Sequence, residues 1–155
     1  MLLLRALAAL LALPGMVAFV LPVWIGASGG HGAGRVIPAA ALLTLGTTVL
    51  HWCIREFYVA GRGTLAPWDP PRHLVTSGPY RLSRNPMYLG VVVILAGWCV
   101  LWSSRTLIIY TALFMMGFHL RVLLVEEPWA RRRFGGEWDA YRARVPRWVI
   151  WGGMT

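Results

Sequence analysis

Apolar residues in this sequence gather in four long runs, and polar segments separate the runs. They cover about residues 6–27, 36–54, 86–102 and 106–125. Each run approaches the roughly 20 apolar residues that a helix needs to cross a bilayer. We therefore predict an all-α, polytopic membrane protein with about four transmembrane helices.

The segments between the runs predict how these helices connect. Pro14-Gly15 predicts a kink in the first run, whose apolar stretch is too long for a cleaved secretory signal, so we expect a retained anchor. A glycine-rich loop follows at residues 28–35. Only residues 103–105 separate the third and fourth runs, which predicts a tight antiparallel hairpin. The one long connection, residues 55–85, precedes the third run.

Composition indicates that lipid is the solvent. Hydrophobic residues make up 57% of the chain and charged residues 14%, whereas about a quarter of the residues in a soluble domain are charged. The chain has nine tryptophans, which is typical of membrane proteins because tryptophan is enriched at membrane–water interfaces. The net charge of +9 comes from arginine alone. Because the chain has no room for a soluble basic domain, we predict no nucleic-acid partner.

Arginine is distributed unevenly between the predicted loops. Twelve arginines lie on one side of the predicted membrane, whereas only Arg35 and Arg105 lie on the other and Arg121 falls inside the fourth run. Since positive residues stay on the cytoplasmic side, both termini and the long connection are predicted to be cytoplasmic. The twelve are Arg5, Arg55, Arg62, Arg72, Arg81, Arg84, Arg131, Arg132, Arg133, Arg142, Arg144 and Arg147.

The C-terminal segment is too polar to span a membrane, yet its apolar residues recur at helical spacing. Phe134, Trp138, Tyr141 and Val145 follow one another at intervals of three or four residues, with arginines between them. This pattern predicts a cytoplasmic amphipathic helix at the membrane interface. Gly135-Gly136 weakens its first turns.

The third run begins with the polar sequence RNPMYLG at residues 84–90. Asn85 is a favoured N-cap and Pro86 fits the first helical position, so a helix is predicted to enter the membrane here. A cap with a basic flank is one interpretation of these residues. The other is that the helix N-terminus and Arg84 bind an anionic group such as a carboxylate.

Glu126 and Glu127 lie at the end of the fourth run, where the negative end of a helix dipole disfavours acids. Glu127 can pair with Arg131 four residues later. Glu126 faces Ala130 at that spacing, so its position favours a cationic ligand. Arg121, one turn earlier, either reaches the interface or has a function.

These groups together predict a ligand with a carboxylate and an ammonium group, and Tyr80 and Tyr88 are placed to hold a flat aromatic group between them. S-adenosylmethionine carries all three groups. Cys53 and Cys99 lie inside apolar runs, where buried free thiols are expected. With no Cys/His spacing that suits a metal, we predict no metal site.

Two motifs carry a resemblance to a known family. HLVTSGPYRLSRNPMYLG followed by EEPWARRRFGGEWDAYRARVPRW resembles the isoprenylcysteine carboxyl methyltransferase and phospholipid methyltransferase superfamily of integral-membrane enzymes, over about residues 60–148. The resemblance implies S-adenosylmethionine-dependent methyl transfer to a lipid or lipidated acceptor. It implies one domain over residues 1–155, with an N-terminal helix pair at 1–58 and a cofactor-binding core at 59–155. The short chain fits a bacterial or archaeal plasma membrane.

The resemblance also implies roles for particular residues. Arg121 and Arg84 become catalytic candidates, with Arg121 placed to orient the acceptor and Glu126 to take the cofactor's amino group. Many relatives have histidine where this chain has Asn85, which cannot be protonated, so a base at this position is in doubt. The implied cofactor-binding residues are His73, Leu74, Val75, Tyr80, Asn85, Pro86, Met87, Tyr88, Glu126 and Glu127.

Other interpretations stay open from the sequence. The acceptor is an isoprenylcysteine carboxylate, a phospholipid amine or another isoprenoid, and the methylated atom follows from that choice. A membrane sterol or enoyl reductase that uses NADPH is an alternative enzyme, although the two adjacent carboxylates fit a positively charged donor better. A non-catalytic membrane scaffold or small transporter is the alternative outside the enzymes.

Overall fold

The computed structural model describes residues 11–26, 33–62 and 71–148, and all the regular secondary structure in these ranges is helical, with no strand among them. The all-α prediction is therefore confirmed for the described residues. The elements are η1 (Leu11–Val20), α2 (Leu21–Gly26), α3 (Ala33–Val59), η2 (Gly78–Arg81), α4 (Pro86–Trp102), α5 (Arg105–Arg121), η3 (Val122–Glu126), α6 (Glu127–Phe134) and α7 (Gly136–Arg144).

All four predicted runs correspond to helices. The third run coincides with α4, and α3 extends the second run at both ends. Within the first run, η1 and α2 follow each other directly. Residues 6–10, residue 27 and most of the glycine-rich loop lie outside the described residues. The kink at Pro14-Gly15 stays a prediction.

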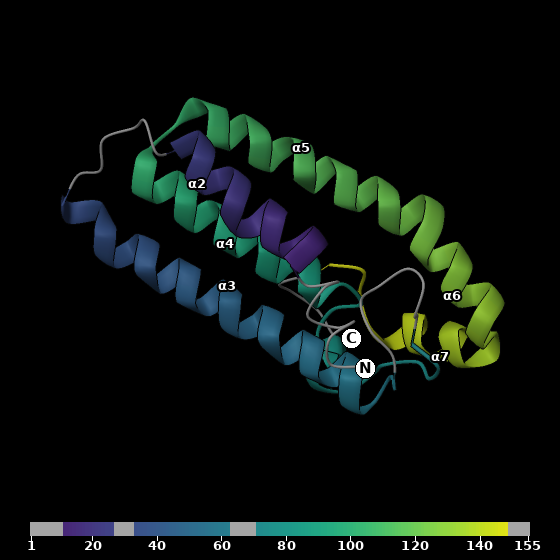
Figure 1. Cartoon of the computed structure of the whole chain (residues 1–155). Helices are drawn as coiled ribbons and strands as arrows, with labels where there is room; N and C mark the ends of the chain where they lie inside the picture. Colours follow the sequence, from purple (N-terminus) through teal and green to yellow (C-terminus); the bar gives the residue numbers. More distant parts are fainter. Residues whose placement is uncertain (1–10, 27–32, 63–70, 149–155) are drawn as a thin grey trace.

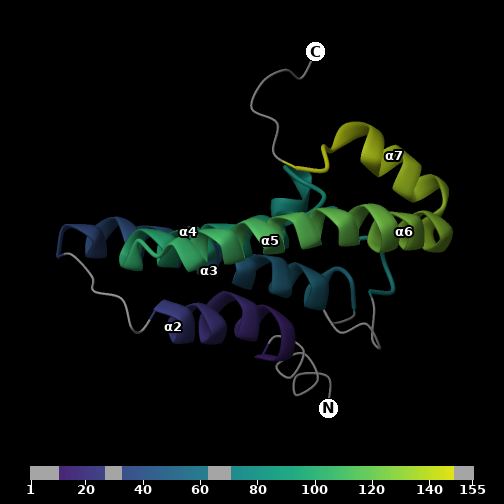
Figure 2. The same ribbon diagram turned by 90° about the horizontal axis from the view of Figure 1, so that it is seen from above.

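Helix α4 is the centre of the bundle. It packs against α3, α5 and the rod formed by η1 and α2, as Figure 1 shows. Figure 2 shows α2 on one side of α4 and α5, and α7 on the other. A core of Ala18, Leu50, Val91, Ile94 and Leu95 joins η1, α3 and α4. The bundle is thus organised around the helix that follows the RNPMYLG sequence.

Three glycines bring α3 and α4 close together, and we call them the glycine seam: Gly46, Gly90 and Gly97. A Cβ added at Gly46 would lie 2.7 Å from the Gly90 carbonyl oxygen and 2.8 Å from the Ile94 backbone nitrogen. At Gly97 it would lie 2.9 Å from Leu43 Cγ. Because these distances leave no space for a side chain, the two backbones make direct contact here.

Side chains from α4 and α5 bind the wide turns of η1. The Trp98 indole N–H donates to the Ala18 carbonyl oxygen at 2.8 Å, and the Tyr110 hydroxyl donates to the Val17 carbonyl oxygen at 3.0 Å. A π-type turn tilts backbone carbonyls out of the regular helical ladder. These two hydrogen bonds use such carbonyls and hold the N-terminal rod against the bundle.

The connection between α4 and α5 is as short as the sequence predicted. Ser103 adopts the left-handed conformation at the end of α4, with φ 47°. Ser104 caps α5, because its hydroxyl accepts a hydrogen bond from the Leu107 N–H at 3.4 Å. The antiparallel hairpin is confirmed (Figure 1).

The fourth run does not end where the sequence suggested. From Arg105 to Phe134 the chain forms one helical stretch of 30 residues, so Glu126 and Glu127 lie within a helix rather than at its end. The premise that both acids sit at a negative helix terminus was therefore wrong. The break comes at Gly135, whose φ of 53° turns the chain into α7.

The apolar residues of α7 face the interior of the protein. Trp138, Tyr141 and Val145 are buried with Ala130, and Leu74 of the long connection packs against them. The helical spacing seen in the sequence is thus explained by packing between α6, α7 and the connection. Its placement at a membrane interface stays a prediction.

Within the part of the chain that the structure describes, two helices are long and apolar enough to cross a membrane: Gly34–Val59 and Arg105–Phe134. Gly15–Gly26 and Pro86–Trp102 are shorter apolar helices. Large apolar side chains cover the outside of α5, such as Ile108, Ile109 and Leu113, each more than half exposed. An exposed apolar surface of this kind suits lipid better than water.

Candidate functional site

A group of charged side chains lies where α4 begins and where η3 passes into α6. We call it the carboxylate cluster: Glu126, Glu127 and the residues that bind them. The Tyr88 hydroxyl donates to Glu126 Oε1 at 2.5 Å, and Arg121 Nε donates to the same oxygen at 2.8 Å. The structure therefore brings three of the predicted site residues together.

The wide turn of η3 explains the pair formed by Arg121 and Glu126. Residues five apart in sequence do not face each other on a regular α-helix, where the neighbours are three or four apart. A π-type turn shifts this spacing to five and is frequent at functional sites. On regular α-helical spacing Glu126 has no partner, which is why its ion pair with Arg121 was not predicted from the sequence.

Glu127 has different partners from those that the sequence suggested. Arg147 donates from Nε and Nη2 to its two oxygens, at 2.8 and 2.7 Å. Arg84 Nη1 lies 3.2 Å from Glu127 Oε1. The predicted pair with Arg131 was wrong, because Arg131 turns to Asp139, 3.9 Å away. Glu127 instead links the tail to the segment before α4.

Asn85 occupies the N-cap position of α4, but its side chain does not cap the helix. Its amide nitrogen donates instead to the Arg147 carbonyl oxygen at 3.0 Å, which also accepts from Ser83 Oγ at 3.0 Å. Pro86 begins the helix as predicted. The N–H groups of Met87 and Tyr88 lie in the first turn, where a helix leaves its amides without backbone partners.

Tyr88 also belongs to an aromatic pair. Its ring stacks on Phe118 of α5, with ring centroids 4.5 Å apart and an angle of 25° between the planes. Phe118 was not among the predicted residues, because nothing in the sequence shows which apolar residue of α5 faces α4. The pair gives the site a flat apolar wall beside the Glu126 carboxylate.

The predicted residues of the long connection lie around α3 and the tail. Val75 and Tyr80 are buried with Cys53 of α3, whereas His73 is exposed. The Tyr141 hydroxyl donates to the Tyr80 carbonyl oxygen at 2.7 Å. Burial raises the pKa of the Tyr80 phenol well above its ordinary value, so this group stays neutral at physiological pH.

Electrostatics distinguishes the two arginines that bind Glu127. Burial lowers the pKa of the Arg84 guanidinium, and the neighbouring Glu127 opposes that shift. The hydrogen bond to Glu127 raises the pKa of Arg147. Both stay protonated at neutral pH. Arg84 also lies 5.5 Å from the ring centroid of Trp138, within the range of a cation–π contact.

Glu56 of α3 is a buried carboxylate that sequence reasoning missed. Ser77 Oγ donates to Glu56 Oε2, and Trp52 Nε1 donates to Oε1 at 3.3 Å. Arg55 forms an ion pair with Oε1 at 3.2 Å. Glu56, like Glu126, is an acid near the end of an apolar run, so the same sequence pattern could have identified it.

Gly78 allows the connection to approach Glu56. Its φ is 57°, and a Cβ there would lie 2.8 Å from Trp52 Nε1 and 2.9 Å from Glu56 Cγ. A residue with a side chain would meet both a strained backbone and these atoms. The SGPY sequence thus folds against the end of α3 and carries Tyr80 into the buried cluster.

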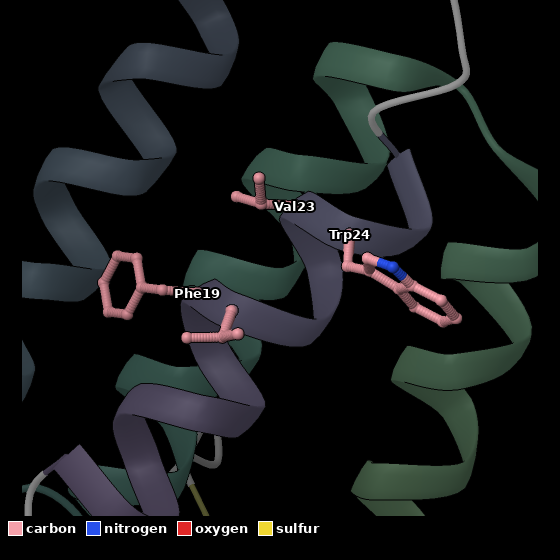
Figure 3. A pocket seen from close by; sticks show the side chains of 4 residues that line it. Phe19, Val23 and Trp24 are labelled. Atoms are coloured by element: carbon pink, nitrogen blue, oxygen red, sulfur yellow. The ribbon is translucent and has the colours of Figure 1, made fainter.

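A shallow apolar hollow lies on the N-terminal rod. Phe19, Val20, Val23 and Trp24 line it, and Figure 3 shows Phe19 and Trp24 pointing to different sides of the helix. The hollow presents no charged side chain that could recognise a carboxylate or an ammonium group. Cys53 and Cys99 are free thiols as predicted, but only Cys53 is buried, whereas Cys99 is half-buried. Among the described residues, no group of three His, Cys, Asp or Glu could hold a metal.

The helical fold, the apolar outer surface and the charged cluster at one end are features of a helical membrane protein with a polar site. A sequence model described as "Phospholipid methyltransferase" matches residues 35–137, more than half of the chain. The chain therefore belongs to the phospholipid methyltransferase family. The matched region contains all the predicted site residues, whereas Arg147 lies outside it.

The chain is also similar to curated proteins. Nickel-cobalt-cadmium resistance protein NccN of Alcaligenes xylosoxydans xylosoxydans is 32% identical over 115 residues, 70% of this chain and 49% of that protein. Two proteins of Oryza sativa, subsp. indica and subsp. japonica, named "Probable protein-S-isoprenylcysteine O-methyltransferase", are 29% identical over 112 residues, 72% of this chain and 53% of theirs. The chain spans about half the length of these relatives. No solved structure matches it.

Proposed function

We propose that this protein is an S-adenosylmethionine-dependent methyltransferase that acts on a lipid-like acceptor, of the isoprenylcysteine-carboxylate or phospholipid-amine type. Family membership and the names of the Oryza relatives support the reaction class. The observation that carries the proposal is the contact between Tyr88 and Glu126. It places a partly exposed carboxylate beside the start of α4.

The residues around this contact fit the groups of the cofactor. The Glu126 side chain is 35% exposed, so its carboxylate can take an ammonium group. Asn85 does not cap α4, so the first-turn N–H groups of Met87 and Tyr88 can take a carboxylate. The ring pair of Tyr88 and Phe118 suits a flat base.

S-adenosylmethionine supplies a methyl group already activated by a positively charged sulfur. The protein then has chiefly to align donor and acceptor and to exclude water. We propose that His73, Leu74, Val75, Tyr80 and Pro86 complete the cofactor-binding surface. Val75 and Tyr80 are buried and fix the connection, and Leu74 joins it to the tail.

Arg121 is the proposed acceptor-orienting residue. Its side chain is 51% exposed and faces the same carboxylate as Tyr88. An acceptor carboxylate is ionised at neutral pH and needs no base, which fits the presence of Asn85 rather than histidine. Arg84 is proposed to support the site through its ion pair with Glu127.

The proposed topology has four membrane spans. Residues 71–85 of the long connection and α7 lie at the same end of the bundle, which supports one charged face (Figure 1). We propose that this face and both termini are cytoplasmic and that the membrane is a bacterial or archaeal plasma membrane. The soluble cofactor would then arrive from the cytoplasm and the acceptor from the bilayer.

Transfer of a radiolabelled methyl group to total membrane lipid tests the function. The purified chain in detergent is expected to label a lipid fraction, and Glu126→Gln should reduce the rate by at least about 100-fold, because a bound ammonium group would lose its counter-charge. Glu137→Gln is the matched control. Glu137 is exposed on α7, so its variant should stay within about twofold of the original rate.

Two results would contradict the proposal. One is an unlabelled lipid fraction together with no heat of binding for S-adenosylhomocysteine in isothermal titration. The other is tight binding of NADPH without binding of S-adenosylhomocysteine, which would favour a reductase.

A further inference from the structure

Two adjacent carboxylates in the carboxylate cluster have different surroundings. Both oxygens of Glu127 are taken by Arg147, and Arg84 adds a second positive charge; the Glu127 side chain is 15% exposed. The two described contacts of Glu126 fall on one oxygen, Oε1, and its side chain is 35% exposed. Successive residues of a helix point in different directions, which allows this division.

Arg147 also binds through its backbone. Its carbonyl oxygen accepts from Ser83 Oγ and Asn85 Nδ2, each at 3.0 Å. The preceding carbonyl, that of Pro146, accepts from the Arg84 N–H at 2.9 Å. The tail therefore lies across the three residues before α4, and its guanidinium reaches Glu127 from there.

We propose that Arg147 is a positioning residue. It holds the Glu127 carboxylate in an ion pair within the protein, so that Glu126 alone binds the cationic end of the ligand. This inference rests on the proposed function. It gives Glu127 a different role from the cofactor contact that the family resemblance implied.

Charge explains why Glu127 is unavailable to an ammonium group. One carboxylate faces two guanidinium groups, so the surroundings of Glu127 carry a net positive charge. To bind Glu127, an ammonium group would have to displace Arg147 from a bidentate ion pair. Bidentate pairs between arginine and a carboxylate are among the stronger ion pairs in proteins. Without Arg147, Glu127 would keep only its single contact with Arg84 and would become a rival carboxylate next to Glu126. A ligand shared between the two would be misaligned for transfer.

The test combines kinetics with a rescue. Arg147→Gln is expected to lower kcat at least about tenfold while KM for S-adenosylmethionine rises less than about threefold, because a small misplacement of the reacting groups slows transfer strongly. The double variant Arg147→Gln with Glu127→Gln removes the rival carboxylate and should restore kcat to within about threefold of the original. If Arg147 served the tail only as a structural anchor, the double variant would be no better than Arg147→Gln.

Arg144→Gln is the matched control, since Arg144 is exposed on the same tail and its Nε donates to the Ala140 carbonyl oxygen of its own helix. Its kcat should stay within about twofold. Should Arg147→Gln fail to fold, Arg147→Lys is the second variant, because lysine keeps the charge but cannot form the bidentate ion pair. It should show a smaller fall in kcat, and adding Glu127→Gln should again restore kcat.

The outcomes separate this inference from the proposed function. If the original protein binds no S-adenosylhomocysteine in isothermal titration, the proposed function fails and the inference falls with it. If it binds and transfers methyl groups, yet removing Glu127 does not rescue either Arg147 variant, only the inference is overturned.

Discussion

The glycine seam and the carboxylate cluster join helices by opposite means. In the seam, α3 and α4 touch because side chains are absent, and an added Cβ would lie 2.7 Å from a neighbouring oxygen. In the cluster, long side chains bridge segments that are far apart in sequence, such as Arg147 and Glu127. Close packing admits no extra atom, whereas hydrogen bonds can be exchanged for those of a ligand. The glycine seam can thus fix the positions of α3 and α4, while the carboxylate cluster remains able to bind a ligand.

The largest effect is expected where the seam is broken. Gly46→Ala should lower the free energy of unfolding by about 3 kcal/mol, the upper part of the range for overpacking, because two of the nearest atoms belong to the backbone and cannot rotate away. Thermal unfolding in detergent, followed by circular dichroism, measures the change.

Gly117→Ala is the matched control on α5. A Cβ at Gly117 meets nothing within 4 Å, so alanine should raise the free energy of unfolding by about 0.5–1 kcal/mol through its higher helix propensity. Equal effects at both positions would show that the seam is no closer than the rest of the helix surface.

A smaller effect is expected at the buried carboxylate of α3, Glu56. Glu56→Ala removes the acceptor of Ser77 and Trp52 and should cost about 2 kcal/mol, because both donors lose their hydrogen bond to a buried, charged acceptor. Glu137→Ala, on the exposed face of α7, should change stability by less than about 0.5 kcal/mol. Chemical denaturation of both variants gives the difference, and a Glu56→Ala variant as stable as the control would contradict the role of this carboxylate.

The contact between the tail and the long connection should contribute less to the free energy of unfolding than Glu56 does. Tyr141→Phe removes one buried hydrogen bond to the Tyr80 carbonyl oxygen, which should lower the free energy of unfolding by about 1 kcal/mol. Tyr58→Phe changes a half-exposed tyrosine of α3 and should have almost no effect. Hydrogen exchange of residues 78–82 adds a local readout: protection should fall in Tyr141→Phe, and unchanged protection would show that the tail does not hold the connection.

The smallest effect is expected at the opposite end of the bundle. Ser104→Ala removes the cap of α5, whose hydrogen bond is long at 3.4 Å, so about 0.5 kcal/mol should be lost. Ser103→Ala, at an exposed position one residue earlier, should be neutral by the same thermal unfolding measurement. A larger loss at Ser104 than at Tyr141 would mean that the hairpin, rather than the tail, limits stability.

Parts of the candidate site were accessible from the sequence. The start of α4 at Pro86 could be predicted because proline and a preceding asparagine mark a helix start through local backbone chemistry. Tyr88 and Glu126, which the family resemblance implied as cofactor-binding residues, are joined by a hydrogen bond, and their role in binding stays a prediction. The side chain of Asn85 was mispredicted, because its partner is a carbonyl 62 residues away.

Apolar length and local helix signals in the sequence determined the helices of this protein, because burying a backbone in lipid requires helices and because caps act within a few residues. The wide turn at Val122–Glu126 and the division between Glu126 and Glu127 were decided by tertiary structure alone. The division depends on side chains such as Tyr88 and Arg147, which reach these acids only when distant segments fold side by side. Which charged groups form an ion pair depends on their distance in the folded protein. The sequence alone does not give that distance.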